Sequence, residues 1–115
     1  MPRYCLLGRV RPERLEDYRE AHRAVWPELL HVLADAGWRN YSLFLREDGL
    51  VIGYAEADDL EEAQRRVAAT EVNARWQAAM SDLFAGLDGA APDQNWELVP
   101  EVFNLEDQLR RHDSA

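Results

Sequence analysis

Residues 38–57, with the sequence WRNYSLFLREDGLVIGYAEA, decide the fold. Apolar and polar side chains alternate over residues 38–46, which is the two-residue period of a half-buried β-strand, and residues 50–57 continue as a second, mostly apolar run. The turn residues EDG at positions 47–49 separate the two runs, and an Asp-Gly pair between alternating segments is a strong signal for a hairpin. The centre of the chain is therefore predicted to be a two-stranded antiparallel hairpin.

The segments on both sides of this hairpin have helical periodicity. Over residues 13–36, apolar side chains recur at steps of three and four residues, which predicts an amphipathic helix. Pro27 is expected to kink this helix, because its nitrogen cannot donate a hydrogen bond and its ring crowds the carbonyl one turn back. Residues 60–83 have the same periodicity and are predicted to form two helical segments with a joint near Thr70.

Two further strands are predicted near the ends of the chain. Residues 4–10 (YCLLGRV) form a short apolar run, and residues 96–103 (WELVPEVF) follow a loop over residues 86–95 that contains Gly, Pro, Asp and Asn. Pro100 requires an edge position or a bulge in the last strand. The element order is then βαββαβ, which predicts an α+β, ferredoxin-like fold: an antiparallel sheet with helices on one face.

The other face of the predicted sheet also carries aromatic and aliphatic side chains. A chain of 115 residues has no second layer to cover that face, so we expect a homodimer of the dimeric α/β-barrel type in which two sheets pack together. The length fits one domain, for which we expect residues 1–104, followed by a polar C-terminal tail over residues 105–115.

The composition excludes several classes of function. The formal net charge is −9, which argues against nucleic acid as a partner. The 13 basic residues are all arginine, and the absence of lysine removes Schiff-base chemistry and the phosphate-loop lysine. Cys5 is the single cysteine, which fits a reducing cytoplasm, and no apolar run approaches the roughly 18 residues of a membrane span.

A stripe along the first predicted helix is the best candidate for a site. Tyr18, His22 and Trp26 are spaced four residues apart, so a phenol, an imidazole and an indole lie along one helix face. Histidine exchanges protons near neutral pH, a phenol can orient a hydroxyl group, and an indole can stack on a sugar ring. Tyr41 and Trp76 can approach this stripe in the predicted fold. The same stripe is also typical of a hydrophobic core, and the residues alone leave both interpretations open.

Other chemistries have less support. Glu28 and His31 have the spacing of a carboxylate and an imidazole on one helix face, but the only other histidine outside the stripe, His112, lies in the tail, so we expect no metal site. Ser42 lies in an alternating strand, and the chain has neither a G-x-S-x-G nor a G-x-G-x-x-G motif. Acyl-enzyme hydrolysis and nucleotide binding are therefore not expected.

The residues of the stripe and hairpin make the chain resemble the L-rhamnose mutarotases. The resemblance rests on Tyr18, on HRAVWPEL at residues 22–29 with its His-x-x-x-Trp-Pro core, on Asn40-Tyr41, on Trp76 ahead of Met80, and on EVF at residues 101–103. It covers nearly the whole chain. It implies a small dimeric enzyme of ferredoxin-like protomers that uses no cofactor.

The resemblance also implies an activity, the interconversion of the α and β anomers of a sugar with His22 as proton donor. This agrees with the chemistry of the residues, because opening a hemiacetal ring needs one proton delivered to the ring oxygen and one removed from the anomeric hydroxyl. The expected site residues are His22 as the catalytic residue, Tyr18, Tyr41, Trp76 and Gln77 in contact with the substrate, and Trp26, Asn40 and Met80 as support for the pocket.

Gln77 departs from the family pattern, which commonly has a second tryptophan after the one matching Trp76. An amide able to hydrogen-bond hydroxyl groups replaces a stacking surface, so a sugar closely related to L-rhamnose is an open alternative as substrate. Two other functions also stay open: a cofactor-independent monooxygenase or isomerase on the same dimeric scaffold, and a sugar-binding module without catalysis.

Overall fold

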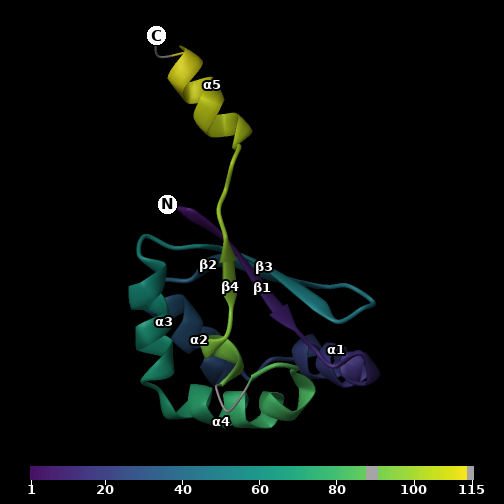
Figure 1. The fold of residues 1–115 in the computed structure, drawn as a ribbon. Coiled ribbons are helices and arrows are strands. Elements are labelled where there is room, and N and C mark those ends of the chain that lie inside the picture. Colours follow the sequence, from purple (N-terminus) through teal and green to yellow (C-terminus); the bar gives the residue numbers. More distant parts are fainter. Residues whose placement is uncertain (88–90, 114–115) are drawn as a thin grey trace.

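The computed structural model describes residues 1–87 and 91–113, and its elements follow the predicted order (Figure 1). The strands are β1 (Arg3–Arg9), β2 (Arg39–Leu45), β3 (Leu50–Glu56) and β4 (Glu97–Val99). The helices are α1 (Leu15–Arg23), α2 (Pro27–Ala36), α3 (Leu60–Ala68), α4 (Glu71–Met80) and α5 (Leu105–Asp113). Short 3-10 turns lie at η1 (Pro12–Arg14), η2 (Ser81–Leu83) and η3 (Pro92–Gln94).

The strands form one antiparallel sheet in the order β2-β3-β1-β4, with α1 to α4 on one side of it (Figure 1). This confirms the predicted α+β, ferredoxin-like fold. The β2–β3 hairpin turns at Asp48-Gly49, where the Asp48 carboxylate pairs with Arg46 and accepts a hydrogen bond from the Leu50 amide. Gly49 has a φ of 94°, and a Cβ there would lie 2.2 Å from the Val10 carbonyl oxygen, so the turn requires glycine.

The prediction of one kinked helix over residues 13–36 is wrong, because the chain forms two separate helices. α1 ends at Arg23, and Trp26 is extended with φ −53° and ψ 127°. Pro27 then begins α2 at a position where no backbone amide is needed and its fixed φ suits the first helical turn. The joint expected near Thr70 is confirmed: Thr70 caps α4 by accepting a hydrogen bond from the Asn73 amide.

The C-terminal region differs from the prediction in the length of its last strand. β4 covers only Glu97–Val99, and the chain leaves the sheet at Pro100 instead of continuing as a strand to residue 103. The expected polar tail contains the helix α5, which projects away from the domain (Figure 1). Arg3 holds the start of this arm through ion pairs with Glu101 and Asp107. Residues 88–90 of the predicted loop lie outside the described residues.

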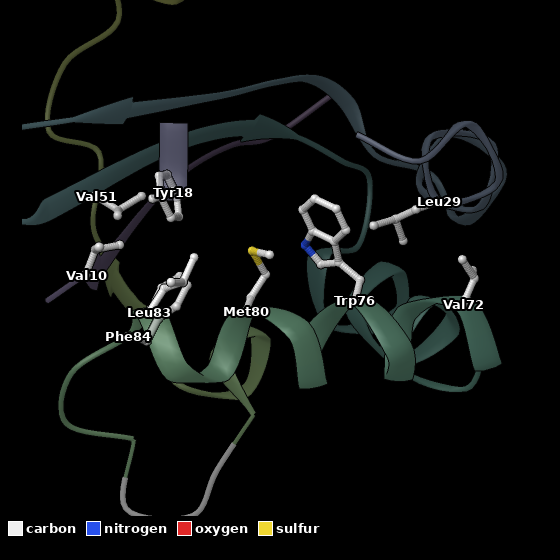
Figure 2. Close-up of a cluster of buried hydrophobic side chains, with 9 residues drawn as sticks. All are labelled: Val10, Tyr18, Leu29, Val51, Val72, Trp76, Met80, Leu83 and Phe84. Carbon is white, nitrogen blue, oxygen red and sulfur yellow. The ribbon is translucent and has the colours of Figure 1, made fainter. Parts of the chain in front are cut away.

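The core lies between the sheet and helices α1 to α4. One cluster of buried side chains joins α1, α4 and the η2 region, and Figure 2 shows Trp76 and Met80 rising from α4 between Leu29 on one side and Phe84 on the other. A second cluster surrounds Leu6 and Trp38 under α3. No helix in the described part of the chain is long and apolar enough to cross a membrane.

The opposite face of the sheet is open in the single chain. Along β3, Val51 and Ala55 are buried against the helices, whereas Ile52 and Tyr54, which point the other way, are only half-buried. Phe44 on β2 is paired with Ile52 and is 58% exposed. This face, formed by β1, β2 and β3, is therefore rich in apolar surface that the chain itself does not cover.

Candidate active site

A cavity of about 310 Å³ lies between the helices and the face of the sheet that they cover. Its volume is at the lower end of the range for small-molecule sites, which runs from about 300 to 1,000 Å³. Its wall is mostly apolar and aromatic, with contributions from Leu29, Leu33, Trp38, Val67 and Trp96. The titratable side chains in this wall are His22, Tyr41 and Asp93.

His22, in the last turn of α1, is fixed by its neighbours. Its Nδ1 donates a hydrogen bond of 2.8 Å to the Tyr18 carbonyl oxygen, one helical turn back. Its ring stacks on the Tyr18 ring at a centroid distance of 4.2 Å and meets the edge of Trp76 at 5.4 Å. The hydrogen bond occupies Nδ1, so Nε2 is the nitrogen available for proton exchange with a molecule in the cavity.

Burial lowers the pKa of His22 below its ordinary value of 6.5, and the hydrogen bond to the Tyr18 carbonyl opposes this shift. The apolar wall disfavours the charged imidazolium, while the carbonyl oxygen favours it. The lowered pKa makes protonated His22 a stronger acid than a free imidazole. Such a group can give up its proton readily to a weakly basic oxygen.

Trp76 and Trp26 form the aromatic side of the site. Trp76 lies on α4, is 7% exposed and lines the cavity. Trp26 lies in the break between α1 and α2, is 37% exposed and meets Trp76 edge to face at 5.1 Å without itself lining the cavity. The break before Pro27 therefore places Trp26 behind Trp76, where it supports the ring that faces the cavity.

Tyr41 reaches the cavity because β2 has a bulge at its start. The register shifts between Arg39 and Ser42, and Asn40 adopts a left-handed φ of 49°. The Asn40 side chain is exposed and donates to Glu56, away from the cavity wall. Burial, followed by the nearby Tyr18 and Asp93, raises the pKa of Tyr41, so its hydroxyl stays protonated and can hydrogen-bond a substrate but does not act as a base.

Tyr18 and Met80 lie behind the cavity wall. Tyr18 is 4% exposed, stacks under His22 and meets Phe84 edge to face, and burial raises its pKa. Met80 belongs to the same buried cluster (Figure 2). Of the residues expected from the sequence, the structure thus brings His22, Tyr41, Trp76 and Gln77 together at the cavity and places the other four outside its wall.

The cavity also contains a polar group that the sequence did not predict. Asn73 Nδ2 donates to Asp93 Oδ2 at 2.9 Å, the Asp93 amide donates to Gln77 Oε1 at 3.2 Å, and Gln77 Nε2 donates to Asn73 Oδ1 at 3.0 Å. These three bonds form a closed ring between α4 and η3. Both polar atoms of Gln77 are used in this ring, so the main role of its amide in this structure is to hold Asp93.

One sequence signal could have pointed to part of this ring. Asn73 and Gln77 are four residues apart on α4, so they share a helix face with each other. Asp93 follows Pro92 in a loop, and nothing local in that loop indicates which helix it meets. The polar pair was visible in the sequence, but its partner depended on the tertiary fold.

The arrangement combines an imidazole, a carboxylate and aromatic surfaces around a cavity of small-molecule size. Such a wall suits a polyhydroxylated ring, because aromatic faces stack on its C–H surface and polar groups bond its hydroxyls. The candidate metal pair from the sequence lies elsewhere: Glu28 is exposed and pairs with Arg75 at 3.6 Å, and His31 is exposed. Among residues 1–87 and 91–113, no group of three or more His, Cys, Asp and Glu side chains is placed to hold a metal ion.

The comparisons of sequence and of structure with known proteins identify the same family. The family model for L-rhamnose mutarotase matches residues 3–105. An L-rhamnose mutarotase from Pectobacterium carotovorum is 35% identical over 107 residues, which cover 92% of this chain and 100% of the relative. The crystal structure of an L-rhamnose mutarotase from Formosa agariphila superposes with a TM-score of 0.71 at 25% identity, covering 91% of this chain and 99% of the other.

The fold alone is shared more widely. The crystal structure of an antibiotic biosynthesis monooxygenase superposes with a TM-score of 0.58 at 17% identity, covering 90% of this chain and all of the other. This likeness supports the ferredoxin-like scaffold and says nothing of the chemistry in the cavity.

Proposed function

This chain belongs to the L-rhamnose mutarotase family, and we propose that it interconverts the α and β anomers of L-rhamnose in the cavity beside His22. The observation that carries the proposal is the fixed imidazole. Its Nδ1 is bound to the Tyr18 carbonyl, and its ring is held between Tyr18 and Trp76, so Nε2 is left for the substrate.

The reaction needs no group beyond acids and bases. Protonated His22 gives its Nε2 proton to the ring oxygen as the C1–O5 bond breaks, while a base takes the proton of the anomeric hydroxyl and the C1=O1 double bond forms. Rotation about the C1–C2 bond presents the other face of the aldehyde, and the reverse proton transfers close the ring. Positioned acid-base groups contribute about 10²- to 10⁴-fold to such a rate.

The contacts of the cavity fit a deoxy sugar. Trp76 and the apolar wall offer stacking and methyl contacts, and the protonated Tyr41 hydroxyl can bond a sugar hydroxyl. We propose L-rhamnose as the preferred substrate and L-mannose and L-fucose as comparison sugars. L-mannose differs from L-rhamnose by a hydroxyl in place of a hydrogen on C6, so it tests whether the wall prefers a methyl group.

We also propose that the enzyme is a homodimer formed through the open face of the sheet. Phe44, Ile52 and Tyr54 lie together on this face through the β2–β3 register, and Phe44 is more than half exposed. Burying such a patch against its own copy gives a symmetric interface of apolar side chains. The cavity lies on the opposite side of the sheet and stays open in this dimer.

We place the activity in the cytoplasm. Cys5 is half-buried and unpaired, as a reducing compartment allows. Cell fractionation with an antibody tests this assignment, and recovery of the protein with the exported fraction would contradict it.

The activity is tested by dissolving one crystalline anomer of L-rhamnose and following its approach to equilibrium with and without the protein. The proposal predicts faster equilibration with the protein. Oxygen consumption with polycyclic phenols is measured on the same preparation, because the shared fold raises a monooxygenase as the alternative. Oxygen uptake without faster equilibration would contradict the proposal, and saturable sugar binding without faster equilibration would indicate a binding module.

A further inference from the structure

Asp93 lines the same cavity as His22, and its carboxylate is held in an unusual way. Oδ2 accepts a hydrogen bond of 2.9 Å from Asn73, whose side chain is only 4% exposed. Oδ1 receives no hydrogen bond and no salt bridge from the described part of the chain. One carboxylate oxygen is therefore anchored, and the other is left for a group outside the chain.

Asn73, which holds the Asp93 carboxylate, is itself fixed by hydrogen bonds. Asn73 is held in turn by Gln77, and the Asp93 backbone amide donates to Gln77 Oε1, so the carboxylate and its own backbone are both tied to α4. If Asp93 turned away, the buried amide of Asn73 would lose its acceptor, which costs free energy. This cost favours the one orientation of Asp93 in which the hydrogen bond forms. Preorganised groups of this kind are typical of catalytic sites.

The charges around Asp93 fit a role as a base. The titratable side chains that share the cavity wall are His22 from α1 and Tyr41 from β2, with Tyr18 behind His22. The negative charge of Asp93 also contributes to the raised pKa of Tyr41, which places the carboxylate within electrostatic reach of that phenol. Tyr41 stays protonated, so its phenol cannot accept a proton from the substrate. The carboxylate of Asp93, in the same wall, can accept one.

We propose that Asp93 is the second proton-transfer group, taking the proton of the anomeric hydroxyl while His22 supplies one to the ring oxygen. This inference rests on the proposed mutarotase activity. In ring opening, Oδ1 of Asp93 accepts the O1 proton as C1=O1 forms and C1–O5 breaks; in ring closure, it returns that proton to O1. Asn73 and Gln77 are positioning residues, because they hold the carboxylate and do not transfer the proton.

Asp93→Asn is the direct test, because it removes the basic oxygen and keeps an acceptor for Asn73 Nδ2. Anomer exchange of L-rhamnose is measured at several sugar concentrations for the wild type and for D93N, and Asp82→Asn serves as the control, since Asp82 is exposed on η2 away from the cavity. We expect kcat of D93N to fall about 10²- to 10⁴-fold with little change in KM, and D82N to match the wild type.

Two results would overturn this role. A D93N variant with the kcat of an active wild type would show that Asp93 transfers no proton, and a raised KM with unchanged kcat would make it only a contact for a sugar hydroxyl. Absence of any acceleration by the wild type would instead overturn the mutarotase proposal itself, and this inference with it. The two failures are therefore distinguishable.

Asp93→Glu covers the case in which D93N does not fold. The glutamate keeps a carboxylate in the cavity wall but moves its oxygens by one methylene group, so kcat should fall below that of the wild type without the complete loss expected for D93N. Circular dichroism reports folding of both variants. A folded D93E with the kcat and KM of the wild type would overturn the assignment.

Discussion

The imidazole of His22 lies on the phenol ring of Tyr18, with ring centroids 4.2 Å apart and Nδ1 2.8 Å from the Tyr18 carbonyl oxygen. Tyr18 therefore sets both the orientation and the tautomer of His22. A carbonyl oxygen can only accept a hydrogen bond, so Nδ1 must carry the hydrogen. Tyr18 acts in this structure through His22, from behind the cavity wall. Nε2, the nitrogen that we propose exchanges protons with the substrate, owes its position to this pair.

The rate of mutarotation should fall as pH rises. In the proposed mechanism protonated His22 is the acid, so its contribution is complete below its pKa and is lost as pH rises through that value. Burial lowers this pKa, and the fall should therefore be centred below pH 6.5. The profile of kcat/KM between pH 4.5 and 8, corrected for the rate without protein, measures it. A flat profile between pH 5 and 8 would contradict the role of His22 as an acid.

Trp76→Ala should weaken both the fold and the site. The indole is buried, lines the cavity and meets the edges of His22 and Trp26. Its removal should lower the free energy of unfolding by about 3–5 kcal/mol. Urea denaturation measures this loss, and Trp76→Phe is the matched variant, since it retains a ring and should lose much less. Equal stability of the alanine variant and the wild type would contradict the packing described here.

Gly8→Ala should disturb the cavity through Trp96. A Cβ at position 8 would lie 2.9 Å from Cζ3 of Trp96, so the indole that lines the cavity has to move. We expect a higher KM for the sugar and a loss of stability of about 1–3 kcal/mol. The double variant with Trp96→Leu removes the ring that the new methyl group meets. The losses of stability caused by Gly8→Ala and by Trp96→Leu should therefore not be additive. Additive losses would show that Gly8 and Trp96 are independent.

Phe44→Asp should separate the proposed dimer. Phe44 is exposed beside Ile52 on the open face, where a buried carboxylate without a partner is costly. Light scattering after size-exclusion chromatography should give a dimer for the wild type and for Ala79→Glu on the exposed side of α4, and a monomer for Phe44→Asp. A monomeric wild type, or a dimeric Phe44→Asp variant, would contradict an interface on this face.

The sequence predicted the sheet well because its signals are local. Alternation over residues 38–46 and the turn at Asp48-Gly49 indicate the hairpin, and a short apolar run indicates β1. The break before Pro27 was not predictable in the same way. Proline is compatible both with a kink inside a helix and with the first turn of a new one, and the helical periodicity continues across the break.

The site was less predictable than the fold. A spacing of four residues places Tyr18 and His22 on one helix face, but it does not tell which ring faces the cavity and which lies beneath it. Gln77 was expected to face the sugar through its amide, whereas in the structure its amide holds Asp93 and Asn73. Contacts between a loop and a helix depend on the assembled fold, and no pattern in the chain encodes them locally.

The role of His22 is tested most directly by saturation-transfer NMR on L-rhamnose at anomeric equilibrium, with the wild type, with His22→Ala and without protein. We expect faster exchange between the anomeric protons with the wild type only, and exchange at the protein-free rate with a folded His22→Ala variant. Exchange by His22→Ala as fast as by the wild type would contradict it.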